Sequence, residues 1–336
     1  MSQLSAVFGC AGPTLSPEEA AFFRETQPWG FILFGRNIET PEQVRRLVGE
    51  MRAAVGEAAP VLIDQEGGRV QRLRPPHWAR YPPGWAYTAL DVAIREEIAW
   101  LGGRLIAHDL LELGVNVDCA PVLDVPQPGA HEVIGDRAYG DAPGAVATIG
   151  RAFADGLLSG GVLPVMKHIP GHGRALADSH ERLPVVSAGL EELRCDFAPF
   201  RANADLPAAM TSHVVYAAID GERPATTSAA VIGSVVRAEI GFDGLLFTDD
   251  LSMKALCGDL ASRAQNALAV GCDIVLHCNG DMDEMSGVAS GARSLAGDSL
   301  RRTDAALARI AKGAESFDVG AARTRFAAAF EALRTA

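Results

Sequence analysis

The feature that most constrains the fold of this chain is a regular alternation of short apolar segments with longer segments of helical periodicity. Short apolar segments bounded by turn residues predict buried strands. Eight strand-then-helix units follow one another, with no Pro/Ser-rich linker between them. Eight such units with parallel strands close into a (β/α)8 barrel. We therefore predict an α/β fold, a TIM-type barrel that forms one catalytic domain over residues 1–336 and ends in helices at about 300–333.

An open, doubly wound sheet is the alternative architecture for such a pattern. That fold requires a glycine-rich phosphate-binding turn after its first strand, and no such turn follows residues 4–10. We expect the barrel strands at residues 4–10, 30–34, 60–63, 115–120, 162–166, 208–212, 245–247 and 273–277. We expect the helices at residues 16–26, 40–55, 92–113, 143–159, 190–204, 229–240, 260–270, 284–295, 300–311 and 321–333.

Charge and cysteine content limit the classes of partner. The chain has 336 residues and a net charge of −12, which argues against nucleic acid or an anionic membrane as its main partner. Its six cysteines are widely spaced, without a CxxC pair, as is typical of buried thiols in a reducing compartment. The N-terminus has no basic region, and no apolar run approaches membrane-spanning length. We expect a cytoplasmic monomer.

The segment VMKHIPGHGRALADSHERLP, residues 165–184, is unusually dense in titratable side chains. Proline and glycine at 170, 171 and 173 exclude a continuing helix or strand, so we expect a structured loop. A loop of this kind at the end of a buried strand is where α/β folds place chemistry. The titratable residues are Lys167, His168, His172, Asp178 and His180.

Two kinds of site are compatible with this loop. Asp178 lies two positions before His180, close enough in an extended segment to hydrogen-bond the imidazole and raise its pKa, which would make His180 a general acid/base. The rival is a metal site built from His168, His172, Asp178 and His180. HxxxH in a loop broken by proline and glycine lacks the helix that aligns such ligands, and the nearby Lys167 would repel a cation. We expect no cofactor and no metal.

Further polar residues lie at or just after the carboxyl ends of predicted strands, the face that carries the active site in (β/α)8 enzymes. Single cases have structural explanations, because an aspartate can cap the next helix and a histidine can be a satisfied core residue. Six such polar residues at the same end of the barrel favour a functional site. They are Asp64, Arg137, Lys167, His168, His213 and Asp249.

The pair Asp249-Asp250 ends the strand predicted at 245–247. Strand side chains alternate in direction, so we expect one carboxylate to point to the barrel axis and the other to bind backbone or an arginine. The local sequence does not decide which is which. An inward carboxylate among apolar walls can act as a nucleophile or base.

The mixture of donors and acceptors on this rim suits a polyhydroxylated ligand. Since no phosphate-binding loop is present, we expect a small carbohydrate as the substrate. A carboxylate nucleophile with a separate acid/base indicates retaining glycoside hydrolysis, with His180 in place of the usual second carboxyl group.

Four motifs in order then resemble the β-N-acetylglucosaminidases of glycoside hydrolase family 3, and most of all the single-domain bacterial enzymes of cell-wall recycling. The motifs are IDQEGGRVQRL (63–73), GDRAYG (135–140), KHIPGHG…DSH (167–180) and LLFTDDLSM (245–253). The resemblance implies cytoplasmic removal of terminal β-linked N-acetylglucosamine from fragments that contain anhydromuramic acid. Two departures from the family pattern, Ile169 in place of Phe and the charged Arg174, leave the chemistry intact.

The resemblance also implies a role for each site residue. Asp249 would be the nucleophile, His180 the acid/base and Asp178 its partner. The residues implied to bind the sugar are Asp64, Arg72, Arg137, Lys167, His168 and His213.

Two alternatives to hydrolysis remain open. A histidine acid/base repels phosphate less than a carboxylate does, so the enzyme could be a glycoside phosphorylase. The other alternative is a non-catalytic sugar-binding barrel, against which the presence of both Asp249 and His180 argues.

Overall fold

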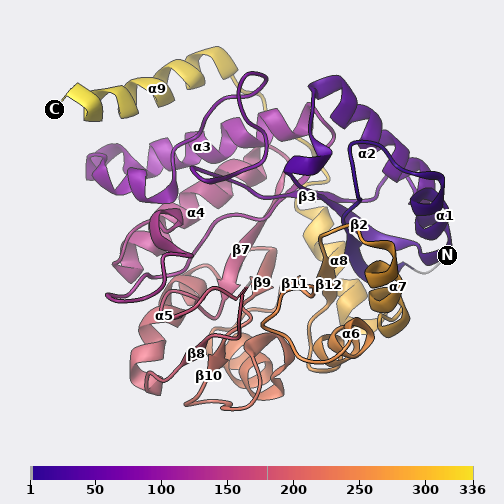
Figure 1. Ribbon diagram of the computed structural model, residues 1–336. Coiled ribbons are helices and arrows are strands. Elements are labelled where there is room, and N and C mark those ends of the chain that lie inside the picture. Colours follow the sequence, from indigo (N-terminus) through magenta and orange to yellow (C-terminus); the bar gives the residue numbers. More distant parts are fainter. Residues whose placement is uncertain (1–2, 180, 336) are drawn as a thin grey trace.

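Eight parallel strands close into a barrel in the computed structural model, which describes residues 3–179 and 181–335 (Figure 1). Around the ring the strands follow chain order, and each pairs in parallel with its neighbour. The predicted (β/α)8 barrel is therefore confirmed. The barrel strands are β1 (Leu4–Phe8), β2 (Pro28–Leu33), β3 (Val61–Ile63), β6 (Val117–Asp118), β7 (Leu163–Ile169), β9 (Ala208–Thr211), β11 (Leu245–Asp250) and β12 (Ile274–His277).

Helices connect the strands and surround the barrel (Figure 1). They are α1 (Pro17–Thr26), α2 (Pro41–Val55), α3 (Val92–Leu111), α4 (Pro143–Ser159), α5 (Leu190–Ala202), the π-helical η5 (Val231–Glu239), α6 (Leu260–Ala269), α7 (Met282–Gly291), α8 (Gly297–Ala308) and α9 (Val319–Thr335). These bounds agree closely with the sequence predictions. Among the described residues, no helix combines the length and apolar character needed to span a bilayer.

Three strands differ from the prediction in a way that matters for the site. β7 runs to Ile169, past the predicted end at 166, so Lys167 and His168 belong to the strand and not to the loop after it. β6 covers only two residues of the strand predicted at 115–120. β11 instead extends to Asp250, so the two aspartates belong to the strand end and do not follow it. Its ladder with β12 shifts register between Phe247 and Asp250.

Two small sheets beyond the barrel were not predicted. β4 (Gln65–Gly67) pairs antiparallel with β5 (Val70–Gln71) directly after β3. β8 (Val185–Val186) pairs in parallel with β10 (Val215–Tyr216). Both sheets lie in the loops that follow barrel strands, the position from which side chains reach the carboxyl-terminal face.

Alternating side chains of the strands divide the core into two layers. On β1, Val7 belongs to the cluster inside the barrel, whereas Phe8 packs outward against the helices. Inside the barrel, Trp29 and Phe247 approach to 5.5 Å between ring centroids. The barrel interior is thus filled with side chains, as expected for eight strands.

Helix α8 closes the amino-terminal end of the barrel. Leu295 and Ala306 join the cluster inside the barrel. The buried Asp273 accepts a hydrogen bond of 2.8 Å from Ser299 and forms ion pairs with Arg302 at 3.2 Å and Arg237 at 3.1 Å. The polar residues of the site lie at the opposite, carboxyl-terminal end of the barrel.

Helices α3 and α4 pack closely because glycine lies at their crossing. A Cβ atom on Gly103 would lie 2.1 Å from the carbonyl oxygen of Phe153, and one on Gly156 would lie 2.2 Å from that of Trp100. Such distances are too short for any side chain, so the two helix backbones could not keep their present separation. Helix α4 in turn contacts β7, the strand that carries Lys167 and His168.

We predict that Gly156→Ala lowers the free energy of unfolding by about 1–3 kcal/mol, because the added methyl group forces two backbones apart. The matched control is Gly49→Ala in α2, where a Cβ would meet nothing within 4 Å. That change should stabilise the protein by about 0.5–1 kcal/mol through helix propensity. Urea unfolding of both variants measures the difference, and equal midpoints for the two would contradict the packing argument.

Candidate active site

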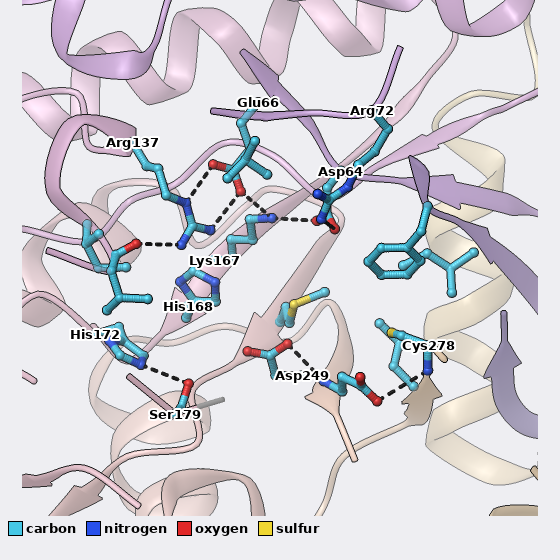
Figure 2. A pocket seen from close by; sticks show the side chains of 18 residues that line it. Asp64, Glu66, Arg72, Arg137, Lys167, His168, His172, Ser179, Asp249 and Cys278 are labelled. Carbon is cyan, nitrogen blue, oxygen red and sulfur yellow. Dashed lines mark hydrogen bonds and ion pairs between the residues drawn. The ribbon is translucent and has the colours of Figure 1, made fainter. Parts of the chain in front are cut away.

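A cavity of about 150 Å³ lies at the carboxyl ends of the barrel strands (Figure 2). Its walls combine charged side chains from several strand ends with an apolar minority. The lining residues are Ile32, Phe34, Asp64, Glu66, Val70, Arg72, Val133, Ile134, Arg137, Lys167, His168, His172, Ser179, Met210, Asp249, Asp250, Leu276 and Cys278. Strand ends far apart in sequence thus converge on one small polar pocket.

Two carboxylates and three cations form a connected network on one side of this pocket (Figure 2). Lys167 Nζ lies 2.8 Å from Asp64 Oδ1 and 2.6 Å from Glu66 Oε1. Arg137 donates to both oxygens of Glu66 at 2.8 Å. Arg72 Nη2 donates to Asp64 Oδ2 at 2.8 Å. Each carboxylate therefore binds two cations, and Lys167 joins the two halves.

The network keeps all of its members charged. Burial alone would raise the pKa of the Asp64 carboxyl, but Lys167 and Arg72 outweigh it and hold that pKa below its usual range. Burial would also raise the pKa of the Glu66 carboxyl, but Arg137 and Lys167 outweigh it and lower that pKa to about 2. Burial would lower the pKa of Lys167, but the carboxylates of Asp64 and Glu66 outweigh it and raise that pKa. Lys167 is therefore a permanent cation, suited to binding a ligand rather than to proton transfer.

His168 follows Lys167 directly, yet both side chains line the pocket. The ladder between β7 and β9 shifts register between Lys167 and Ile169, which interrupts the usual alternation of side chains. His168 Nδ1 lies 2.6 Å from Asp124 Oδ2. Burial raises the pKa of the Asp124 carboxyl, but the neighbouring His168 outweighs it and the pKa is lowered. An ionised Asp124 fixes the proton on Nδ1 and leaves Nε2 to the pocket.

Asp124 also holds the loop that follows β7. Its Oδ1 accepts hydrogen bonds from the backbone N–H of His168 at 3.2 Å and from that of His172 at 2.6 Å. Gly173 lies so close to this segment that a Cβ would be 2.0 Å from the carbonyl oxygen of Val125. The start of the predicted loop is therefore tightly held against the chain that follows β6.

His172 lines the pocket from this loop, with its Nε2 3.4 Å from Ser179 Oγ. Burial and the neighbouring His168 lower the pKa of His172 to about 4. The imidazole is therefore neutral near pH 7, which makes it a poor general acid.

The structure describes only one member of the predicted acid/base pair, Asp178. His180 lies outside the described residues. Asp178 is half-buried and does not line the pocket, and its carbonyl oxygen accepts hydrogen bonds from Glu181 N and Arg182 N at 3.0 and 3.1 Å. The Asp178–His180 dyad thus stays a prediction.

The structure separates the two neighbouring aspartates at the end of β11. The Asp249 carboxylate faces the pocket, and its Oδ1 accepts the backbone N–H of Asp250 at 2.8 Å (Figure 2). Asp250 accepts the backbone N–H groups of Ser252 and Cys278 at 3.0 and 3.2 Å and the Ser252 hydroxyl at 2.7 Å. Asp250 therefore ties the ends of β11 and β12 together, which leaves Asp249 as the candidate for chemistry.

His213, expected among the sugar-binding residues, does not line the pocket. It is fully buried, with Nδ1 2.7 Å from Thr226 Oγ1 and Nε2 3.0 Å from the carbonyl oxygen of Asp250. Burial lowers its pKa. Its position supports the backbone of β11 from behind, so the alternative of a satisfied core histidine fits this placement better than contact with substrate.

Sequence reasoning missed two residues that hold the site together, Glu66 and Asp124. Both offered a weak signal, since each is a carboxylate shortly after a predicted strand. Glu66 lies two residues after Asp64, in the quoted motif, and Asp124 follows the strand predicted at 115–120. Within residues 3–179 and 181–335, no group of three or more His, Cys, Asp or Glu side chains is arranged to hold a metal ion.

Comparison with known proteins supports a carbohydrate-active site. Residues 1–312 match the glycosyl hydrolase family 3 N terminal domain. A beta-hexosaminidase from Alkalilimnicola ehrlichii is 41% identical over 281 residues, covering 81% of this chain and 80% of that protein. A beta-hexosaminidase from Pseudomonas aeruginosa is 40% identical, covering 82% and 83%. The solved structure of NagZ from Neisseria gonorrhoeae with N-trifluoroacetyl-D-glucosamine is similar at a TM-score of 0.84, with 32% identity and coverage of 99% and 98%.

The charge network predicts a pH-dependent loss of stability in Glu66→Gln. The folded-state pKa of Glu66 is about 2, below the ordinary 4.5, so its stabilising effect is complete above pH 4.5 and is lost as pH falls toward 2. At pH 7 the variant should lose about 3 kcal/mol, because the buried Arg137 then loses its carboxylate partner and Lys167 loses one of its two. Its deficit should shrink steadily between pH 4.5 and 2 in urea unfolding measured across that range.

Glu97→Gln is the matched control. Glu97 also accepts hydrogen bonds of 2.8 Å from two nitrogens of an arginine, Nε and Nη2 of Arg325, but on the surface. Its loss should cost at most about 1 kcal/mol. A Glu66→Gln deficit no larger than that of the control would show that the network contributes little.

Proposed function

Because the chain belongs to glycosyl hydrolase family 3, we propose that this glycoside hydrolase is a retaining, exo-acting β-N-acetylglucosaminidase. One observation carries the proposal: the Asp249 carboxylate faces the same small cavity as the network of Asp64, Glu66 and Lys167. A nucleophile and a set of groups suited to sugar hydroxyls therefore share one pocket. The names of the relatives, beta-hexosaminidases and a NagZ bound to an N-acylated glucosamine, support N-acetylglucosamine as the sugar.

Five of the expected sugar-binding residues line the cavity, and we assign them to the hydroxyl groups. Each retains hydrogen-bonding capacity beyond its partners described above, because a carboxylate offers about four acceptor sites, an ammonium three donors and a guanidinium five. His168 adds its Nε2. The five residues are Asp64, Arg72, Arg137, Lys167 and His168.

The reaction then has two steps. Asp249 attacks the anomeric carbon while His180, supported by Asp178, protonates the departing oxygen, and a covalent glycosyl-enzyme forms. His180 next takes a proton from water, which attacks the same carbon and releases the sugar with its β-configuration retained. The hydrogen bond from Asp250 N to Asp249 Oδ1 supports this assignment, because it fixes the orientation of the attacking carboxylate.

For the natural substrate we propose muropeptide fragments that carry N-acetylglucosamine on anhydromuramic acid, hydrolysed in the cytoplasm by one catalytic domain spanning residues 1–336. The family resemblance and the acidic composition, which disfavours an anionic membrane or nucleic acid partner, support this choice. Comparing turnover with and without phosphate tests hydrolysis against phosphorolysis. An increase in rate together with release of a sugar phosphate would identify a phosphorylase.

Asp249→Ala should reduce turnover of an aryl N-acetylglucosaminide on the order of a thousandfold or more, because no covalent intermediate can form. Asp250→Ala should be milder, since Asp250 acts through the positions of Ser252 and Cys278. Thermal unfolding of both variants checks that they fold, and mass spectrometry of the trapped glycosyl-enzyme locates the nucleophile. A label on Asp250, or near-native turnover of Asp249→Ala, would reject the assignment.

His180→Ala should penalise substrates according to their leaving group. A sugar alkoxide needs the proton that His180 supplies, whereas an acidic nitrophenolate hardly does, so the loss in the first step should differ on the order of 10²–10⁴-fold between them. With the good leaving group the variant should accumulate glycosyl-enzyme, because the base of the second step is missing. Asp178→Ala should show the same pattern more weakly.

The measurement is a series of aryl glucosaminides of graded acidity under single-turnover conditions. Equal losses across the series would mean that His180 only binds sugar.

A further inference from the structure

The loop after β3 concentrates positive charge beside the sugar pocket. Residues 67–90 contain four arginines and one histidine but no Asp or Glu, although the chain as a whole carries a net charge of −12. This loop leaves the carboxyl end of β3 and so belongs to the catalytic face of the barrel. Such a local excess of one charge in an acidic protein indicates a surface for an anionic ligand.

The arginines line a row of hollows that adjoins the sugar pocket. Arg72 lines that pocket and also a hollow of about 410 Å³ that contains Arg74, His77 and Trp78 (Figure 2 shows Arg72 beside Asp64). Arg74 in turn lines a further hollow of about 260 Å³ together with Arg69 and Arg80. The row leads away from the pocket along the loop, and we call the surface formed by Arg69, Arg72, Arg74 and Arg80 the arginine groove.

Two of the four guanidinium groups already bind carboxylates. Arg72 pairs with Asp64, and Arg69 pairs with Asp136 at 3.0 Å. Among the described residues, Arg74 donates to backbone carbonyl groups alone, those of Gln71 at 2.6 Å and Arg69 at 3.2 Å.

Arg80 is exposed and forms no hydrogen bond or ion pair with the described residues. Acidic side chains also border this surface: Asp64 and Asp136 already pair with the other two arginines, Asp136 shares a further hollow with Arg80, and Glu39 lines the larger hollow. Within the described residues, none of the three forms an ion pair with Arg74 or Arg80. Arg74 and Arg80 therefore leave uncompensated positive charge along the groove.

We propose that Arg74 and Arg80 bind carboxylates carried by the part of the substrate that leaves, so that the groove selects acidic aglycones. This inference rests on the proposed glucosaminidase function. A guanidinium binds a carboxylate through two parallel hydrogen bonds, which makes arginine well suited to this task. The half-buried Trp78 adds an apolar face to the hollow that contains Arg74. The carboxylates can belong to the second sugar itself or to a peptide attached to it.

Arg80→Gln and Arg74→Gln/Arg80→Gln test the groove. The first change removes charge without removing a hydrogen bond seen in the structure, and the pair removes both uncompensated groups. Arg24→Gln/Arg46→Gln is the matched control, since both arginines are exposed on outer helices and the change in net charge is the same. The four substrates are a neutral aryl N-acetylglucosaminide, diacetylchitobiose, N-acetylglucosaminyl-N-acetylmuramic acid and its derivative with an acidic peptide.

The double variant should lower kcat/KM for acidic substrates about 3- to 10-fold at low salt, while diacetylchitobiose changes less than twofold. Added salt should lower the kcat/KM of the wild type for acidic substrates toward that of the variant, because salt screens the charges. A loss seen already with the muramic acid disaccharide places the carboxylate on the sugar, whereas a loss confined to the peptide derivative places it on the peptide. Equal effects on neutral and acidic substrates, or equal effects of the control variant, would overturn the proposal.

Calorimetry separates this proposal from the proposed catalytic function. Affinities for the same acidic and neutral disaccharides are measured in an Asp249→Ala background, where no turnover is needed. Weaker binding of the acidic ligand alone when Arg74 and Arg80 are replaced supports the groove, even if the wild type fails to hydrolyse glucosaminides. Unchanged affinity for the acidic ligands would reject the groove, even if the wild type is an active glucosaminidase.

Discussion

The rest of the site depends on the ion pairs that Lys167 forms with Asp64 and Glu66. All three side chains are largely withdrawn from water, with exposed fractions of 3%, 14% and 5%. Removing a charge from water is costly, and this cost is met only when opposite charges and hydrogen bonds replace the solvent. Arg72, from the same loop as the two carboxylates, and Arg137, from the loop after β6, complete that replacement. Removing any one member would therefore leave a buried neighbour of opposite charge without one of its partners, so the five residues act as a unit.

The barrel makes such a unit possible because it brings distant segments to one face. Asp64 and Lys167 are 103 residues apart in sequence, yet they follow or end parallel strands and so meet at the same rim. The same geometry separates Asp249 from Asp250, because successive side chains of β11 face different surroundings. Asp250 binds backbone groups of two strand ends, and His213 holds its carbonyl oxygen from behind. The proposed nucleophile is thus held by groups that have no direct part in the chemistry.

Much of this arrangement could be read from the sequence, and the rest could not for identifiable reasons. Strand periodicity and the order of the eight units predicted the barrel, and that in turn predicted that Asp64, Lys167, His168 and Asp249 share a rim. Periodicity says nothing about partners, so the pairing of Glu66 with Arg137 across 71 residues was not foreseen.

Nor did local sequence show that Asp124 would reach His168. The sugar-binding role expected of His213 came from the family resemblance and from its position after a strand. Neither reveals that Thr226 and the Asp250 backbone occupy both ring nitrogens.

A sugar that enters the pocket meets charges whose partners are already in place. In the proposed complex, hydroxyl groups of the sugar bind Arg137 and Lys167 and replace the hydrogen bonds that solvent offers these groups. A substrate that lacks one of these hydroxyls leaves a buried charged group short of a partner, which costs far more than the loss of an apolar contact. Under the proposed function, the same network that stabilises the pocket makes recognition strict at the sugar. The proposed arginine groove is exposed to water and so gives only a graded preference for the group to which the sugar is attached.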